Sequence, residues 1–514
     1  GDALAVGDGL EFETAASLCF GRYDAERGRL VLERDRFSRG EEVRFHVGET
    51  YCIDRRPLGI RGRMHDAVRA GFADELVRSV LEGDHEIVRN ARRHALALDF
   101  LGETGLNPAQ IEAGAAAIAD ERLCLVQGPP GTGKTRLLAE VVKGLCARGT
   151  RVALVAFTHR AVDNALCAIR ALDDELPLFK LGYPDAANAE LRAARVSMTS
   201  RASGLPEQGI VVGGTCFAAA KIAAEQRFHV AVFDEAGQMP TAHAIAGMLL
   251  ARHFVLFGDH RQLPPVITAE HADPEVTESV FERLHRLYGG HLLDTTYRMN
   301  DGVCDVVSRA FYGGRLHPAE TAASRRVPFV PGGRFDEILD PERPAVFARV
   351  DHSQPGMRSL EEAALTADLC EELVVRHGVP IREIAVIAPF RAQVRAIRSA
   401  VQRRTRLPVD QLVVDTVERI QGQEREAVVV SLAVGDPETL DQRAAFFFST
   451  NRLNVALSRA RTKAILVASS LAFRALPLDA DSLRAVAVFQ GIVESLPTVD
   501  MTSSYAERCE PDPA

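Results

Sequence analysis

The chain has 514 residues, enough for two to four domains with large apolar cores. Apolar residues make up 46% and charged residues 25%, which is typical of globular proteins, and the net charge of −9 excludes a surface that is basic throughout. No apolar run approaches the roughly 20 residues that span a bilayer, and the first ten residues lack a signal core, so we expect a cytoplasmic protein without a membrane anchor.

Residues 1–95 differ in pattern from the rest of the chain. Short alternating runs at 30–32 and 43–45 are broken by glycine and charged residues, which predicts a small β-rich, barrel-like module. Apolar residues at helical spacing follow over 66–99 and predict a helical stalk.

From residue 106 onward, buried-strand patterns alternate with helical ones, which predicts an α/β fold with parallel sheets. The runs form two series, at 123–126, 152–157, 210–212, 230–233 and 254–257, and at 384–387, 412–414, 427–432 and 464–467. We therefore expect two tandem domains, 96–295 and 296–500. Residues 322–360, rich in Pro, Gly and Arg, are expected to be a loop or insertion, and residues 501–514 a disordered tail.

The segment GPPGTGKT, at 128–135, matches the phosphate-binding loop pattern G-x-x-x-x-G-K-[ST] between a predicted strand and a predicted helix. Glycines let successive N–H groups point at phosphate oxygens, and the helix adds its positive N-terminus. Lys134 can reach the β- and γ-phosphates, and the Thr135 hydroxyl can bind Mg²⁺. The predicted ATP-binding loop consists of Gly128, Pro129, Pro130, Gly131, Thr132, Gly133, Lys134 and Thr135.

Two further segments follow buried strands of the first series. Asp234 and Glu235 end the strand at 230–233, where one carboxylate can hold Mg²⁺ and the other can deprotonate the attacking water. GDHRQLPP, at 258–265, places Asp259 and Gln262 after the next strand. Because ligands bind at the carboxyl ends of parallel strands, we expect all four side chains near the phosphates.

Together with LNPAQ (106–110), TTYRM (295–299), VDTVERIQGQERE (414–426) and NRLNVALSRARTK (451–463), these segments resemble superfamily 1 helicases. The nearest branch by this resemblance contains the nonsense-mediated-decay RNA helicase and senataxin. The similarity covers about residues 100–470, and it implies two RecA-like domains that hydrolyse ATP between them.

The resemblance also implies roles for single residues. Gln110 would read the adenine edge, and Gln262 would sense the γ-phosphate. Arg298 and Arg459 would reach the nucleotide from the second domain, while Gly422 and Glu424 would contact its ribose or phosphates. The segments at 156–166 and 213–216, with Thr416, match those that grip the nucleic-acid backbone.

The leading hypothesis is thus an ATP- and Mg²⁺-dependent helicase or translocase on single-stranded DNA or RNA, moving 5′→3′ as the resembled branch does. An ATP-gated nucleic-acid clamp or nucleoprotein remodeller is the alternative. A nucleotide kinase or GTPase shares the phosphate loop, but it explains neither the second α/β domain nor Arg298 and Arg459, and no N-K-x-D segment is present.

Nine cysteines are scattered without a C-x-x-C pair, which argues against a zinc ribbon. The chain begins with glycine rather than methionine, as expected of a fragment or processed chain. We expect a monomer, and we expect any nuclease or loading factor to lie outside this sequence.

Overall fold

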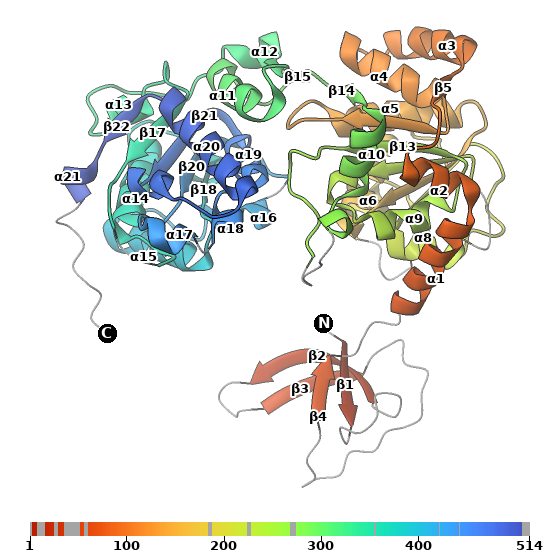
Figure 1. The fold of residues 1–514 in the computed structure, drawn as a ribbon, viewed down its shortest axis with the longest axis horizontal. Coiled ribbons are helices and arrows are strands. Elements are labelled where there is room, and N and C mark those ends of the chain that lie inside the picture. The colour runs from red at the N-terminus through yellow and green to blue at the C-terminus, as the bar shows by residue number, and fades with distance from the viewer. Residues whose placement is uncertain are drawn as a thin grey trace.

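The computed structural model describes residues 3–7, 16–24, 29–34, 52–55, 60–182, 188–223, 228–267, 274–353, 356–420, 422–441 and 443–505. Two α/β bodies lie side by side, each built on one parallel sheet (Figure 1). The first is drawn in orange to green and the second in green to blue. Among the described residues, no helix combines the length and apolar character needed to cross a membrane.

The first sheet has eight strands, and every neighbouring pair is parallel. In spatial order they are β10 (Ser197–Thr199), β9 (Leu178–Leu181), β11 (Ile210–Thr215), β8 (Arg151–Ala156), β12 (Val230–Asp234), β13 (His253–Gly258), β7 (Leu123–Gln127) and β14 (His291–Leu292). The central strands are buried along almost their whole length, as their continuous apolar sequences predict.

Helices cover both faces of this sheet. One face packs against α3 (Ala91–Gly102), α4 (Pro108–Ala119), α5 (Lys134–Cys146), α6 (His159–Leu172) and α7 (Ala189–Ala193). The other packs against α1 (Ile60–Ala73), α2 (Glu75–Glu82), α8 (Cys216–Ile222), α9 (Thr241–Met248) and α10 (Val280–Tyr288).

The second sheet has six strands, again all parallel. Their order is β19 (Val413–Asp415), β18 (Ile384–Ile387), β20 (Arg425–Ser431), β21 (Ala460–Ala468), β17 (Ala345–Arg349) and β22 (Thr498–Asp500). The two parallel sheets agree with the predicted α/β class and are consistent with tandem RecA-like domains.

Two helical layers enclose the second sheet. One contains α11 (Asp301–Tyr312), α16 (Val417–Ile420), α17 (Pro437–Asp441), α18 (Ala444–Phe447), α19 (Thr450–Leu457) and α20 (Ala480–Ser495). The other contains α13 (Asp336–Leu339), α14 (Leu360–Val375), α15 (Arg391–Arg404) and α21 (Thr502–Tyr505). The short α12 (Glu320–Ala323) follows α11.

Three segments differ from the expectation. The predicted stalk over 66–99 is three helices, α1, α2 and α3, because Asp74 caps α2 and Gly83, with φ of 88°, ends it, and the strand β5 precedes α3. The segment 322–360 contains β17, an inner strand of the second sheet, rather than only loop. Residues 501–505 are ordered, since the Tyr505 ring is fully buried and its hydroxyl donates to Asp368 at 2.7 Å. The rest of the expected tail lies outside the described residues.

Of the predicted β-rich module, the structure describes four strands. They are β3 (Arg29–Arg34), β2 (Ala16–Asp24), β1 (Ala3–Gly7) and β4 (Cys52–Arg55), paired antiparallel in this order. The intervening residues, including the predicted run at 43–45, lie outside the described part. Two small ribbons complete the fold, β5 (Val88–Arg89) with β6 (Asp120–Glu121) and β15 (Thr295–Thr296) with β16 (His317–Pro318).

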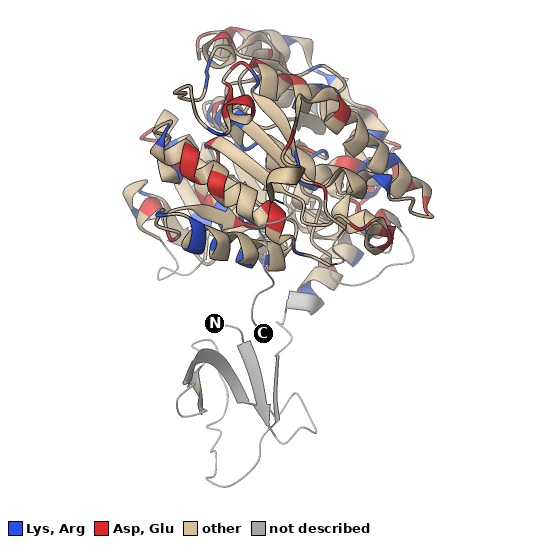
Figure 2. Cartoon of the chain, turned by 90° about the vertical axis from the view of Figure 1, so that its left-hand side faces the viewer, with Lys and Arg blue, Asp and Glu red and all other residues tan. Residues whose placement is uncertain are grey.

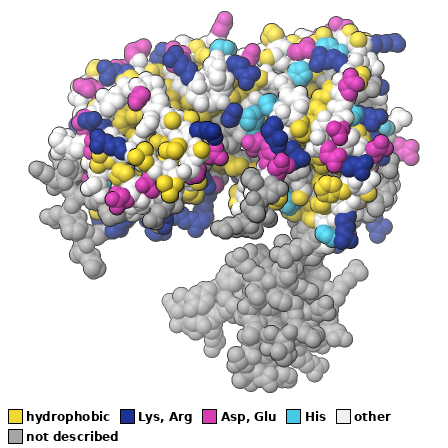
Figure 3. Space-filling model, viewed as in Figure 1, with side chains coloured by type: hydrophobic (Ala, Val, Ile, Leu, Met, Phe, Trp, Pro, Cys, Tyr) yellow, Lys and Arg dark blue, Asp and Glu magenta, His cyan; other side chains and the backbone are white. Residues whose placement is uncertain are grey.

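Charges of both signs are interspersed over the helices of the second domain that face the viewer in Figure 2. Basic, acidic and histidine side chains also gather where the first domain faces the second (Figure 3). The described surface is therefore mixed in charge on these views, and a nucleic-acid track has to be sought locally.

Candidate active site

The predicted phosphate loop connects β7 to α5 at the carboxyl edge of the first sheet. Gly131 and Gly133 have φ of 75° and 74°, in the left-handed region that favours glycine. A Cβ on Gly131 would lie 2.4 Å from the Cβ of Arg298, so glycine is also required by close packing. The loop thus leaves its N–H groups and the N-terminus of α5 facing a cleft.

Lys134, Asp234 and Glu235 form a charged group beside this loop. The Lys134 ammonium lies 3.1 Å from Glu235 Oε1, and Asp234 Oδ1 accepts the Glu235 N–H at 2.9 Å. Burial opposes the charge of Lys134, but the two carboxylates outweigh burial and raise the pKa of Lys134. In this structure Glu235 therefore forms an ion pair with the same ammonium that is predicted to bind the phosphates of ATP.

The pKa values of the two carboxylates are shifted in opposite directions. Burial, reinforced by the charge of Glu235, raises the pKa of Asp234 to about 6. Burial also acts on Glu235, yet the Lys134 ammonium prevails and lowers the pKa of Glu235. An ionised Glu235 fits a general base, and a buried carboxylate such as Asp234, whose charge is opposed by burial and by Glu235, would be stabilised by a metal ion.

The loop after β13 lies against the loop after β12. Asp259 accepts hydrogen bonds from Gln127 Nε2 at 3.0 Å and from Gln262 Nε2 at 2.8 Å. A Cβ on Gly237 would come within 2.7 Å of the Asp259 carbonyl oxygen. The glycine in DEAGQ is therefore what lets the two loops touch.

Gln110 is buried beneath the phosphate loop, where its Nε2 donates to the Thr132 carbonyl at 2.8 Å. Its Oε1 accepts the Asn107 N–H at 3.0 Å, and Asn107 Nδ2 donates to the Tyr297 hydroxyl at 2.9 Å. Tyr297, 40% exposed, was missed as a candidate although TTYRM was singled out. An exposed ring next to the predicted adenine reader can stack on a base.

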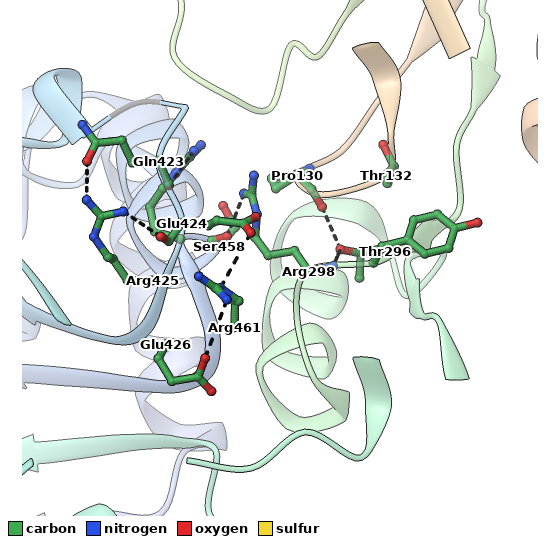
Figure 4. Close-up of polar contacts among 12 residues, drawn as sticks. Pro130, Thr132, Thr296, Arg298, Gln423, Glu424, Arg425, Glu426, Ser458 and Arg461 are labelled. Carbon is green, nitrogen blue, oxygen red and sulfur yellow. Dashed lines mark hydrogen bonds and ion pairs between the residues drawn. The ribbon is translucent and has the colours of Figure 1, made fainter. Parts of the chain in front are cut away.

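Arg298 follows β15 at the junction of the two domains, with its Cβ against the phosphate loop and its guanidinium on the second domain (Figure 4). Its Nε donates to Glu424 Oε2 at 2.9 Å and its Nη1 to the Ser458 carbonyl at 3.0 Å. The preceding Thr296 hydroxyl donates to the Pro130 carbonyl at 2.9 Å, so the segment leading to Arg298 is bound to the phosphate loop. Glu424 thus contacts a predicted finger rather than the cleft itself.

Arg459 is 3% exposed and approaches the same cleft from the second domain. Its Nε donates to the Val455 carbonyl at 3.1 Å and its Nη1 to the Gln423 carbonyl at 3.2 Å. Burial, with the nearby charge of Arg298, lowers the pKa of Arg459 to about 9, and the charge of Glu235 opposes this. Two desolvated guanidinium groups side by side favour an anion between the domains.

A cleft of about 430 Å³ brings most of the predicted residues together. It is lined by the loop residues Gly128, Pro129, Pro130, Gly131, Thr132, Gly133, Lys134 and Thr135 and by Asp234, Glu235, Gln262, Arg298, Gly422 and Arg459. Gln110 and Glu424 touch its walls from behind through Thr132 and Arg298.

Several residues of the cleft wall were not predicted from the sequence as nucleotide-site residues, namely Arg136, Phe157, Thr158, Arg160, Ala161, Asn164 and Gln238. Most belong to AFTHRAVDNAL, which was interpreted as a nucleic-acid contact alone. The signal was its position after a buried strand, which puts its start at the same sheet edge as the phosphate loop.

The residues predicted to grip a nucleic-acid backbone also follow strand ends. Thr158 follows β8 and caps α6, Thr215 ends β11 and caps α8, and Thr416 follows β19 of the second sheet. Capping hydroxyls and helix N-termini are phosphate-binding features when they reach solvent. Thr158 is exposed and Thr416 is half-buried, whereas Thr215 is buried and does not meet this condition. Both domains therefore present such features at the carboxyl edges of their sheets.

A second cluster, Asp336, Glu372 and His377, has the composition of a metal site. His377 Nδ1, however, accepts the Val330 N–H at 2.9 Å, which leaves the proton on Nε2 and removes that nitrogen as a ligand. Asp336 receives the N–H groups of Gly332 and Gly333, and Glu372 that of Phe335. The cluster therefore fastens the 330–336 loop.

The fold and the cleft define a P-loop nucleotide-binding protein with two parallel-sheet domains. Two families, each described as AAA domain, match the chain at residues 105–325 and 276–471. These matches agree with the predicted pair of P-loop, ATP-binding domains.

Several curated proteins resemble the chain over most of its length. The DNA replication ATP-dependent helicase/nuclease JHS1 of Arabidopsis thaliana is 30% identical over 416 residues, 77% of this chain and 31% of that protein. The helicase/nuclease DNA2 of Xenopus laevis is 29% identical over 399 residues, 71% of this chain and 37% of that protein. The chain thus spans about a third of the length of these relatives.

A solved complex of the arterivirus nonstructural protein 10 helicase with DNA is 17% identical, with a TM-score of 0.38 over 74% of this chain and 65% of that one. This structural likeness is too weak to support a conclusion, and the relationship that follows rests on the sequence matches alone. The chain is thus distantly related to Dna2-type helicases, while the nonsense-mediated-decay and senataxin branch stays a prediction.

Proposed function

We propose that the protein is an ATP-dependent helicase or translocase that moves 5′→3′ along single-stranded DNA. The observation that carries the proposal is the shared cleft. Lys134 and Glu235 stand on the first domain, and Arg459 stands opposite on the second. A nucleotide bound there would draw the domains together, and its hydrolysis would release them.

The residues can be given roles in this cycle. Lys134 would leave Glu235 for the β- and γ-phosphates, and the freed carboxylate would accept a proton from the attacking water. Arg298 and Arg459 would neutralise charge on the transferred phosphoryl group. Mg²⁺ would neutralise further charge on the phosphates, and Thr135 and Asp234, both in the cleft wall, are the oxygen ligands that fit it.

DNA is the proposed substrate because the similar proteins are named as DNA replication helicase/nucleases. Threonines at the carboxyl edges of both sheets would hold the phosphate backbone. Alternate grip by the two domains would then convert closure and opening into movement along the strand.

Strand displacement on a duplex with a 5′ overhang tests the proposal against the alternative of an ATP-gated clamp. ATP hydrolysis should rise with single-stranded DNA, and displacement should require the 5′ overhang. ATPase stimulated by a strand, without displacement on either overhang, would favour the clamp. Stronger stimulation by RNA than by DNA in the same assay would mean that RNA, rather than DNA, is the substrate.

Lys134→Ala should abolish ATP turnover, because the ammonium that faces the phosphates is lost. Lys143→Ala, later on the same helix and outside the cleft, is the matched control and should hydrolyse ATP at the wild-type rate. Equal turnover in the two variants would contradict the assignment of the cleft as the ATPase site.

A further inference from the structure

The loop at 259–263, which carries the predicted γ-phosphate sensor Gln262, belongs to the first domain in sequence but is held by the second. Asn454 Nδ2 donates to the Arg261 carbonyl at 2.7 Å, and Asn451 Nδ2 donates to the His260 carbonyl at 2.9 Å. Leu263, 7% exposed, packs into the apolar core of the second domain with Met299 and other residues of that core. The second domain thus grips this loop through both polar and apolar contacts.

Asp259 is the centre of the polar contacts. It is 3% exposed and accepts hydrogen bonds from Gln127 Nε2, the Arg261 N–H, Gln262 Nε2 and the Tyr312 hydroxyl. The last two bonds, at 2.8 and 2.7 Å, end on the same oxygen, Oδ2. A buried carboxylate that is held by four donors has a fixed orientation, and losing one donor is costly.

Tyr312 brings the second domain to that oxygen. It is 3% exposed in α11, and its own oxygen accepts a hydrogen bond from Asn454 Nδ2 at 2.9 Å. Because an ionised carboxylate only accepts, the chain runs in one direction, from Asn454 through the Tyr312 hydroxyl to Asp259. Asn454 Oδ1 is buried without a hydrogen-bond partner, so one acceptor in this series of hydrogen bonds is unsatisfied.

We propose that Tyr312 is a positioning residue that couples the orientation of the second domain to Gln262 through Asp259. When the domains separate, Oδ2 loses the Tyr312 hydroxyl and no longer holds the Gln262 amide in one place. When they close, the amide is fixed at the cleft wall. This inference rests on the proposed function, since it assigns a route by which a bound strand stimulates hydrolysis.

The hydrogen-bonding capacity of Gln262 shows what is positioned. Its Nε2 donates to Asp259 and, at 3.4 Å, to the Gly128 carbonyl, which accounts for both N–H bonds of the amide. The amide oxygen is then the group with capacity left for the cleft, where it can accept a hydrogen bond from the attacking water, whose proton goes to Glu235. A change at Tyr312 should therefore alter the rate of hydrolysis more than the binding of ATP.

The test compares Tyr312→Phe with Tyr505→Phe in the full chain. Tyr505 is a matched control, because its buried hydroxyl also donates to a carboxylate, Asp368, at 2.7 Å, but remote from the domain contact. Each variant is assayed for ATP hydrolysis with and without a single-stranded DNA homopolymer. The affinity for that strand is also measured with and without a non-hydrolysable ATP analogue.

Tyr312→Phe should lower the strand-stimulated kcat on the order of tenfold, which corresponds to about 1.4 kcal/mol, with KM for ATP within about twofold. The effect of the analogue on strand affinity should disappear as well. Tyr505→Phe should change neither quantity. Full stimulation and a full analogue effect in Tyr312→Phe would overturn the proposal.

A second variant keeps the test decisive if Tyr312→Phe fails to fold. Asn454→Ala removes the donor to the Tyr312 hydroxyl and to the Arg261 carbonyl, and it should lower the strand-stimulated kcat while KM for ATP stays within about twofold. Normal stimulation in a folded Asn454→Ala protein would also overturn the proposal. If the wild-type protein showed no stimulation by the strand, that result would instead contradict the proposed function. The positioning role of Tyr312 would then be tested by basal kcat, which should fall in Tyr312→Phe and not in Tyr505→Phe.

Discussion

Lys134, Asp234 and Glu235 place three ionisable groups next to one another in the cleft, with Lys134 and Asp234 mostly buried and the Glu235 side chain 38% exposed. The single positive charge of the ammonium cannot balance two carboxylates. The pKa of Asp234 therefore rises while that of Glu235 falls. Glu235 also has φ of 53°, a left-handed conformation that costs a residue with a Cβ roughly 1 kcal/mol or more. The surrounding loops therefore hold this carboxylate in one place at an energetic cost, as at many catalytic positions.

Glu235→Gln should bind ATP and strand but hydrolyse ATP at least ~10²-fold more slowly, because the amide cannot accept the proton of the attacking water. Trapped ATP should also tighten strand binding. The comparison is Glu112→Gln, whose carboxylate pairs with Arg89 away from the cleft. Normal multiple-turnover hydrolysis in Glu235→Gln would exclude Glu235 as the base.

At the scale of elements, the site depends on two loops that follow neighbouring parallel strands. The loop after β12 carries the carboxylates and the loop after β13 carries Gln262, and they touch where Gly237 meets the backbone of Asp259. Glycine at this point sets the distance between base and sensor.

Gly237→Ala should slow hydrolysis by up to ~10²-fold, because a Cβ 2.7 Å from the Asp259 carbonyl oxygen would push the two loops apart. Gly102→Ala is the control, since a Cβ there meets nothing within 4 Å. The checks are ATPase rate and circular dichroism. An unchanged rate in a folded Gly237→Ala protein would show that this contact has no functional weight.

A second element-scale feature is the buried Lys463 of β21, which donates to the carbonyls of Asp340 and Arg343. Burial lowers the pKa of Lys463 from its ordinary 10.5 to about 7. Between these values the unfolded chain binds more protons than the native one, so this residue makes stability rise with pH.

The free energy of unfolding of the wild type, relative to that of Lys463→Met, should therefore increase from pH 7 to pH 9 by at most about 1.4 kcal/mol per pH unit. The difference in melting temperature between the two proteins should rise accordingly. Lys143→Met, on a partly exposed side of α5, should show no such change. A constant difference between wild type and Lys463→Met across this range would mean that Lys463 keeps its proton.

At the scale of the whole molecule, the two sheets are joined by direct contacts at the cleft. Arg298 is held by Glu424 and the Ser458 carbonyl, while Thr296, two residues earlier, is bound to the phosphate loop. One short segment thus connects the nucleotide site to the second domain. Any change at the phosphates that shifts this segment must be felt by both domains.

Arg459→Ala should lower kcat for ATP by roughly 10³-fold with little change in the dissociation constant of an ATP analogue, as expected for a group that acts on the transferred phosphoryl. Arg309→Ala, on the exposed side of α11, serves as the control. An effect confined to ATP binding would remove Arg459 from the role of a finger.

Much of this arrangement could be predicted because its signals are local. Continuous apolar runs predicted the central strands of both sheets, and GPPGTGKT predicted a turn that only glycines can form. The strand β17 was missed, because five residues after a Pro- and Arg-rich stretch carry too little pattern to separate a strand from a loop. The break in the stalk at Asp74 was missed because a single capping residue does not alter the apolar spacing around it.

The sequence by itself determined the identity of the chemical groups: a phosphate loop, a carboxylate pair, an amide and two arginines in a fixed order along the chain. Only the tertiary structure decided their partners. Arg298 meets Glu424, 126 positions away, and Tyr312 meets Asp259, 53 positions away. Such pairings depend on how two separately folded sheets face each other, and no periodicity within either domain encodes that relation.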